Sequence, residues 1–179
     1  VVCDADLVWL NVVARWPGSV HDSKILRLSS LFRSFEGNEK PVDGIILADS
    51  GYMLRPWLMT PVRNPRTRKE RQYNFSHSSA RTTVERAIGV TKQRWHCLRA
   101  RLRLQPTKAC KVIVVCFMLH NKARRLRLPP PPDDSSESSD SSSDNDSSDE
   151  DDQANVGNEE RARTAAGKAV RDRIIQQNF

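Results

Sequence analysis

Two kinds of feature are missing from this sequence. Its four cysteines form no Cys-x-x-Cys pair, and neither His77 nor His120 has a Cys or His partner at the spacing of a zinc site. No apolar run is long enough to cross a membrane, and the longest, residues 112–119, has the length of a buried core element. Three of the cysteines lie in apolar runs. We therefore expect an intracellular protein with reduced cysteines and no membrane partner.

The sequence also begins without a methionine, in the middle of an apolar run. We interpret it as a fragment whose natural N-terminal part is missing.

Acidic residues are scarce where basic ones are common. Residues 1–128 hold 24 Lys and Arg against nine Asp and Glu, a formal charge of +15. Residues 129–160 hold 12 Asp and Glu and no Lys or Arg, and residues 161–179 return to +4. We expect a folded domain over 1–128, a disordered Ser/Asp-rich tail over 129–160 and a short basic segment, helical as one alternative, over 161–179. A domain this basic favours a polyanionic partner, first of all nucleic acid.

The N-terminal half of the domain has a mixed α/β pattern. Residues 1–16 predict two extended pieces around a polar turn, hence a hairpin. A helix should follow with Ser19 as its N-cap and Asp22 in its first turn. Residues 45–48 are wholly apolar, which predicts a short strand covered on both faces.

The second half of the domain predicts helices. We expect a basic loop over residues 62–78 and an amphipathic helix over residues 77–98, whose apolar stripe recurs every three or four residues. Pro106 opens a further helix with an apolar centre.

Two acids stand out against this background. Asp49 comes directly after the predicted strand 45–48, and Glu85 lies on the predicted helix 77–98. Acids at a strand end and on a nearby helix can share Mg²⁺ or Mn²⁺, since hard cations prefer oxygen ligands. A pair of such ions can activate water or a 3′-hydroxyl at a phosphodiester.

Each acid also has a purely structural interpretation. Asp49 can accept hydrogen bonds from the amides of the following Ser-Gly turn. Glu85 can form an exposed pair with Arg81 four residues before it, which contributes only about 0.3–0.5 kcal/mol. Spacing alone does not decide between these roles and metal binding.

Several motifs together resemble the PIF/Harbinger family of DDE transposases and the nuclease-like proteins derived from them. The motifs are "VVARWPGSVHDSKIL", "LADSGYMLRPWLMTPV", "NFSHSSARTTVERAIGVTKQRWHCL" and "VVCFMLHN". They cover about residues 1–122, in the family's order. The resemblance implies a ribonuclease-H-like α/β fold, a mixed sheet flanked by helices, with an Asp-Asp-Glu centre for a divalent metal cation (Mg²⁺ or Mn²⁺).

The resemblance assigns roles to three acids of this chain. Asp49 matches the Asp of the family's "DSGY" motif and Glu85 the Glu of its "VERAFG"-like helix, and both would be catalytic and metal-binding. Asp22 matches the Asp of a "GSxxDS" motif and would be a further metal ligand, although it also suits a helix N-terminus. The family's first catalytic Asp, in an "IDGTH"-like motif on the first strand, has no match. We expect that strand to be missing, with Asp4 and Asp6 as weaker substitutes because both fit a turn.

DNA is the partner that both lines of reasoning favour. Basic residues would bind its backbone with salt-dependent affinity: Arg63, Arg66, Arg68, Lys69, Arg71, Arg81 and Lys92. Base readout would belong to other segments or to a separate DNA-binding partner protein.

The predicted function is divalent-metal-dependent cleavage of DNA by a transposase-derived endonuclease. The alternative is a derivative that binds DNA or protein without catalysis. We expect a nuclear protein, with the cytoplasm as a further location.

Overall fold

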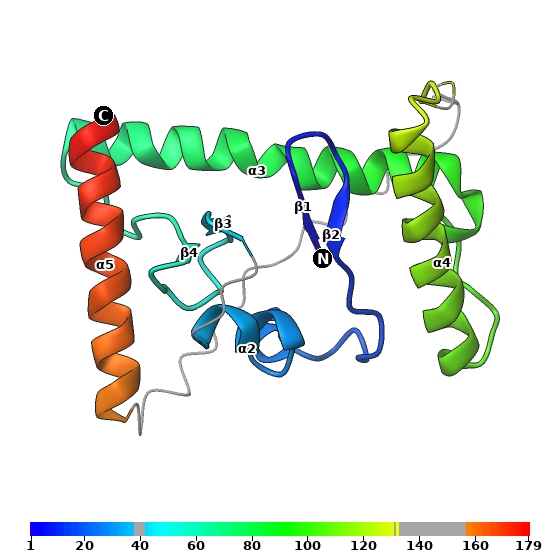
Figure 1. Cartoon of the computed structure of the whole chain (residues 1–179), viewed down its shortest axis with the longest axis horizontal. Coiled ribbons are helices and arrows are strands. Elements are labelled where there is room, and N and C mark those ends of the chain that lie inside the picture. Colours follow the sequence, from blue (N-terminus) through cyan, green and yellow to red (C-terminus); the bar gives the residue numbers. More distant parts are fainter. Residues whose placement is uncertain (38–41, 131, 133–156) are drawn as a thin grey trace.

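The computed structural model describes residues 1–37, 42–130, 132 and 157–179. In these ranges the chain forms helices and two small sheets, so the predicted mixed α/β class is confirmed at this level. One long helix, α3, lies along one side of the molecule, and Figure 1 shows both sheets beneath it. The strands are β1 (Val2–Cys3), β2 (Trp9–Asn11), β3 (Ile46–Leu47) and β4 (Leu58–Met59). The helices are α1 (Asp22–Arg27), α2 (Ser30–Glu36), α3 (Arg68–Arg94), the 3-10 helix η1 (His96–Leu98), α4 (Pro106–Arg125) and α5 (Asn158–Asn178).

Helix α3 begins nine residues before the predicted helix at 77, so the expected basic loop over 62–78 is wrong in its second half. The cause is a capping box. The Thr67 hydroxyl accepts from the Glu70 N–H at 3.2 Å, and the Glu70 carboxylate accepts from the Thr67 N–H at 2.7 Å. These two bonds satisfy N–H groups that a helix start leaves free. The helix ends at Arg94, where the chain passes into η1.

The predicted N-terminal hairpin is present as β1 and β2, paired antiparallel. Its turn is built on Asp4, whose carboxylate accepts from the N–H groups of Asp6 and Val8, both at 2.9 Å. Asp4 therefore has the turn role that made it a poor substitute for a catalytic acid.

The second sheet pairs β3 with β4 in parallel. The predicted strand over 45–48 is shortened to two residues, and its expected burial on both faces is wrong. Ile45 is exposed, while Ile46 and Leu47 are half-buried. One face of β3 is thus open in the described structure.

The single helix expected after Ser19 is divided in two. His21, not Ser19, caps α1, with its Nδ1 accepting from the Ser23 N–H at 3.2 Å. Ser29 then starts α2, because its hydroxyl accepts from the Phe32 N–H at 3.1 Å. The predicted helix breaks at this point because the Ser29 hydroxyl can cap a second helix.

A buried polar cluster joins the hairpin to α3 and α4. The Thr91 hydroxyl accepts from the Trp9 indole N–H at 3.0 Å and lies 3.1 Å from Nδ1 of His120. Nε2 of His120 is 2.8 Å from the Leu7 carbonyl, so it carries the proton. Asn121 bonds both backbone groups of Trp9, at 2.7 and 2.8 Å, as a neighbouring strand would. His120 and Asn121 therefore hold the hairpin against α3 and α4.

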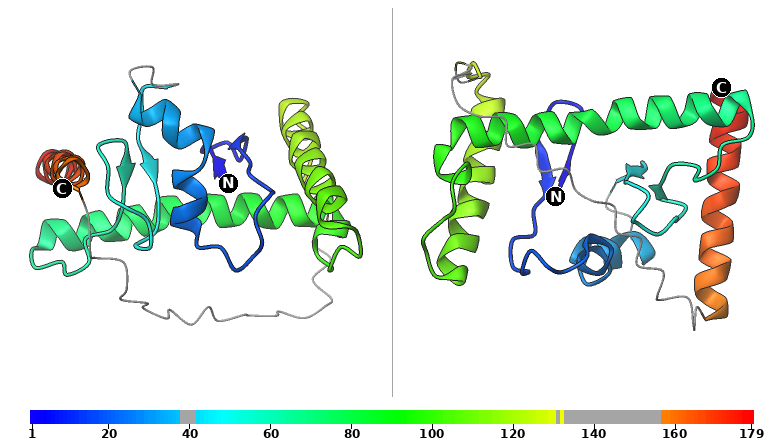
Figure 2. Two further views of the ribbon diagram at one scale, coloured as in Figure 1. Left: turned by 90° about the horizontal axis from the view of Figure 1, so that it is seen from below. Right: turned by 180° about the vertical axis from the view of Figure 1, so that it is seen from behind.

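Helix α5 packs across the other end of α3 (Figures 1 and 2) and starts three residues before the predicted segment at 161. Its Gly167 lies directly on the backbone of Arg55, where an added Cβ would meet three backbone atoms at 2.8–3.0 Å. Arg55 is 1% exposed, and its guanidinium bonds Glu36, Glu160 and Thr164. A charge removed from water in this way is stable only with such partners.

The predicted acidic tail over 129–160 lies mostly outside the described residues. Within the described ranges, no helix is long and apolar enough to cross a membrane.

All four cysteines are free thiols, but the expectation of cysteines inside the core holds only for Cys116. Burial raises the pKa of Cys116 to about 11, while Cys97, whose Sγ lies 3.8 Å away, is exposed.

Two glycines in helices provide a matched test of the α5 contact. Gly167→Ala should lower the free energy of unfolding by about 1–3 kcal/mol, because its methyl group would overlap the Arg55 backbone. Gly89→Ala should raise it by about 1 kcal/mol, because no described atom lies within 4 Å of a Cβ there and Ala favours a helix. Urea unfolding measures both values, and equal changes for the two variants would contradict this packing of α5.

The two buried histidines predict how stability depends on pH. Burial lowers the pKa of His77 and of His120 below the ordinary 6.5, although each ring also bonds a backbone carbonyl. The unfolded chain therefore binds more protons below pH 6.5, and the free energy of unfolding should fall as the pH drops from 7 to 5. Denaturant titrations should show a smaller fall for His77→Gln than for the natural chain. An identical pH dependence in both would refute this explanation.

Candidate metal and phosphate-binding site

Asp49 lies where β3 ends, as predicted. The N–H of Ala48 donates to the Met59 carbonyl at 2.9 Å, so pairing with β4 continues to the residue before the acid. Oδ1 of Asp49 then accepts from the Gly51 N–H at 2.9 Å. A Cβ at Gly51 would lie 3.2 Å from that oxygen, which explains the glycine. The turn therefore uses one oxygen of Asp49 and orients the other.

The second oxygen of Asp49 faces Arg81 of α3 at 3.9 Å. The two side chains are 44% and 31% exposed, so water screens the pair and its contribution is about 0–1 kcal/mol. Arg81 makes this contact instead of the helical pair with Glu85 that was the alternative interpretation. A weak, reversible pair of this kind can be displaced by another cation.

Asp22 approaches the same region from the first turn of α1. The Tyr52 side chain hydrogen-bonds Asp22, and the carboxylates of Asp22 and Asp49 are both close enough to act on its phenol. Burial, the two nearby carboxylates and that hydrogen bond together raise the pKa of the Tyr52 phenol well above its ordinary value. The phenol therefore keeps its proton and serves as a donor to Asp22.

These groups border a cavity of about 280 Å³ between the two sheets, α1 and α3. Asp22, Asp49, Tyr52 and Arg81 supply most of its polar side chains. Its other walls come from both sheets, α1, α2 and α3: Val1, Val2, Asn11, Val13, Ile25, Leu26, Ser29, Leu31, Ile46, Leu47, Ala48, Leu58, Val84 and Ile88. The end of the cavity where the carboxylates of Asp22 and Asp49 lie therefore suits a cation better than an anion.

Glu85 is brought near this cavity but not into it. It is exposed on α3 and does not line the cavity, whereas Arg81, Val84 and Ile88 of the same helix do. Residues four apart on a helix are neighbours, so Glu85 lies one turn beyond Arg81 on a similar side.

The donor set around Asp49 fits a hard divalent cation only in part. Asp22 and Asp49 supply carboxylate oxygens, the ligand type that Mg²⁺ and Mn²⁺ prefer. Across the described ranges, however, no three His, Cys, Asp or Glu side chains are grouped closely enough to hold a metal ion. The structure brings two of the three predicted ligands to one cavity and leaves Glu85 outside it.

The predicted phosphate-binding residues occupy three places along α3 and the segment before it. Five are exposed at its N-terminal end: Arg63, Arg66, Arg68, Lys69 and Arg71. The Lys69 ammonium also donates to the Gln176 carbonyl of α5 at 3.1 Å. Arg81 faces the cavity roughly 18 Å further along the helix, and Lys92 lies roughly 16 Å beyond it, at 1.5 Å per residue. These cations do not form one patch.

Sequence reasoning missed two features of this site. Tyr52 follows Asp49 by three residues in the quoted motif, yet its role as a donor to Asp22 depends on how α1 packs. Arg81 was expected to bind phosphate, and its contact with Asp49 joins residues 32 apart in sequence. Neither contact has a local sequence signal.

Comparison with known proteins supplies a family. The sequence profile described as "DDE superfamily endonuclease" matches residues 1–121. "Putative nuclease HARBI1" of Mus musculus is 38% identical over 124 residues, which are 68% of this chain and 35% of the mouse protein. "Protein ALP1-like" of Arabidopsis thaliana is 31% identical over 134 residues, 67% of this chain and 33% of that protein. The resemblance to Harbinger-type proteins is therefore confirmed.

The match is limited in extent. The chain spans about a third of the length of the curated relatives it matches. No solved structure gives a significant match.

The closeness of Asp22 to Tyr52 can be tested by the ionisation of Tyr52. The chain has two tyrosines, so Tyr73→Phe leaves Tyr52 as the single phenol. In that background, Asp22→Asn should lower the pKa of Tyr52, because it removes a nearby negative charge. Ultraviolet titration of phenolate absorbance measures the midpoint. Asp43→Asn, an exposed acid that does not line the cavity, is the control and should leave the midpoint unchanged. Equal midpoints in all three proteins would remove Asp22 from this site.

Proposed function

The chain belongs to the DDE superfamily endonucleases, and on that premise we propose that it is part of a transposase-derived endonuclease. Its substrate is the phosphodiester backbone of DNA, and its cofactor is Mg²⁺ or Mn²⁺. One observation supports this most directly. Asp22 and Asp49, from different elements, border one cavity next to the helix that carries Glu85.

The residues of this chain have distinct roles in the proposed reaction. Asp49 would hold the cation through the oxygen that its turn leaves free, and Asp22, which the Tyr52 side chain hydrogen-bonds, would be a second ligand. Glu85, on the same helix as Arg81, would be the third ligand. A bound divalent cation supplies activation of water or a 3′-hydroxyl and stabilisation of the leaving oxygen.

Arg81 and the cations at the start of α3 bind the DNA backbone in this proposal. The Arg81 guanidinium is 31% exposed and only weakly paired with Asp49, so it can bind a phosphate through two N–H groups. Arg63, Arg66 and Arg68 are exposed and extend the contact along the strand. Affinity should therefore decrease with salt concentration.

The fold we propose for the complete domain is ribonuclease-H-like, with the two sheets as parts of one mixed sheet. Each described sheet has two strands, so each strand has an unpaired edge. The cavity between them is lined by Val2 of β1 and by Ile46 and Leu47 of β3. A strand placed there would pair with both sheets, cover the half-buried side of β3 and carry a further acid toward Asp49. We also propose a nuclear location, because the proposed substrate is DNA.

A binding protein without catalysis is the second candidate. It is favoured by the position of Glu85 outside the cavity and by the contact of Arg81 with Asp49, which puts a fixed positive charge where a metal would be. The two candidates differ in whether Mn²⁺ binds to Asp22 and Asp49.

Mn²⁺ titration followed by electron paramagnetic resonance tests the proposal. Asp49→Asn and Asp22→Asn should each weaken Mn²⁺ binding about tenfold or more, since even outer-shell partners of metal ligands matter by about 10–100-fold. Arg81→Gln should tighten binding, because it removes the competing cation from Asp49. Asp43→Asn is the control and should bind as the natural chain does.

The outcomes separate the two candidates. Mn²⁺ binding that depends on Asp22 and Asp49, with nicking of plasmid DNA lost in Glu85→Gln, supports the endonuclease. DNA binding with no dependence of Mn²⁺ affinity on either Asp refutes the metal site and leaves the binding protein.

A further inference from the structure

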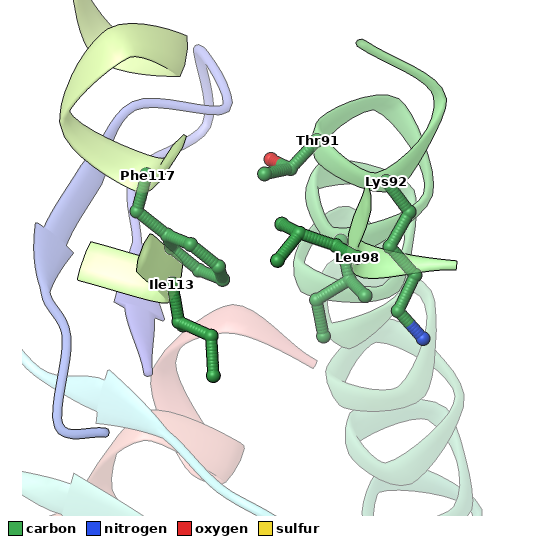
Figure 3. Close-up of a pocket in the computed structure, with 6 residues that line it drawn as sticks. Thr91, Lys92, Leu98, Ile113 and Phe117 are labelled. Atoms are coloured by element: carbon green, nitrogen blue, oxygen red, sulfur yellow. The ribbon is translucent and has the colours of Figure 1, made fainter. Parts of the chain in front are cut away.

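The outer side of α4 is apolar although its sequence predicts a buried element. The run over residues 112–119 has the length of a core element, but in the structure only one side of α4 packs on α3 and β2. Figure 3 shows this inner side, where Ile113 and Phe117 point toward Thr91 and Leu98 around a small cavity. The opposite side has no partner among the described residues.

Three exposed side chains of this outer side form one strip. They are Val115, Met118 and Leu119, which are 50%, 65% and 41% exposed. We call these three residues the α4 apolar face. At 100° per residue they fall within about a quarter of the helix circumference. A helix that is apolar on all sides is normally covered on all sides.

Positive charges lie at both ends of the α4 apolar face. Lys108 and Lys111 precede it, and Lys122 and Arg125 lie at its C-terminal end, all exposed. Helix α4 contains no Asp or Glu, and none of these four cations forms an ion pair within the described residues. A partner that covers this surface must be apolar in its middle and acidic at both ends.

Three other occupants fit this pattern poorly. A second copy of α4 packed antiparallel would put the lysines at one end against the cations at the other. The acidic residues 133–156 supply charge but include only Ala154 and Val156 as apolar side chains. DNA would neutralise the lysines and leave the α4 apolar face uncovered. Each of these occupants would leave either the apolar or the charged part of the surface without a partner.

We propose that the outer side of α4 is a docking surface for an acidic amphipathic helix of a partner protein. The apolar stripe of that helix covers Val115, Met118 and Leu119, and carboxylates in its first and last turns pair with Lys111 and Lys122. Helix-on-helix docking of this kind is a common recognition mode. The surface lies on the side of α4 turned away from α3, so this inference is independent of the proposed cleavage of DNA.

A synthetic peptide serves as the probe. It is an 18-residue helix with leucines along one side and glutamates in its first and last turns, labelled with fluorescein for anisotropy. The chain should bind it with micromolar affinity, and the double variant Met118→Gln, Leu119→Gln should weaken binding at least tenfold. Phe75→Gln is the matched control, because that phenyl ring is 76% exposed on α3 and away from α4. All the substituted side chains are exposed, so the fold should persist.

Charge reversal provides the second arm. The variant Lys111→Glu, Lys122→Glu should lose the glutamate peptide and gain a peptide with lysines at its ends. The proposal is overturned if the natural chain binds both peptides equally, or if Met118→Gln, Leu119→Gln changes nothing. It is also overturned if the same residues mediate dimerisation in sedimentation, or binding to phosphatidylserine vesicles while the peptide does not bind. A longer chain with the length of the relatives that does not bind the peptide would likewise overturn it, because the rest of the same protein would then cover this face.

Discussion

The position of every other described element depends on helix α3 and on how its two ends are held. The helix has 27 residues, about 40 Å at 1.5 Å per residue. Toward its C-terminal end, the hydroxyl of Thr91 meets Trp9 and His120 in a buried polar cluster. Toward its N-terminal end, Tyr73 and His77 bond the carbonyls of Thr60 and Met59. Each contact involves a buried polar group, and leaving one unpaired costs about 1–3 kcal/mol. The two sheets are therefore fixed along one rigid axis.

This arrangement explains why acids from distant parts of the sequence meet at one cavity. Asp49 ends a strand that packs against α3, and Asp22 begins a helix that follows the hairpin held by the buried cluster. Two nearby carboxylates raise each other's free energy unless positive charge or a hydrogen-bond donor offsets them. Arg81 and Tyr52 meet this need in the described structure. A divalent cation would meet it more strongly, and this is the role of the metal site that we propose.

Local patterns in the sequence predicted which elements form better than where those elements end or what they contact. The apolar run before Asp49 and the turn after it correctly placed that acid at a strand end. The start of α3 was missed, although Thr67 and Glu70 have the spacing of a capping box, because five cations nearby suggested a loop. Ser29 divided a predicted helix because its hydroxyl could cap a second one. The contact of Arg81 with Asp49 and the burial of Arg55 under Gly167 depend on packing between remote segments. No window of sequence contains such information.

The central claim is that Asp22 and Asp49 hold one divalent cation in the cavity beneath α3. Anomalous diffraction from crystals of the protein soaked in Mn²⁺ tests it most directly, because manganese is located independently of any activity. The account predicts a single strong peak between the Asp22 and Asp49 carboxylates, with Arg81 displaced from Asp49. A peak elsewhere, or Asp49 still paired with Arg81 at saturating Mn²⁺, would contradict it.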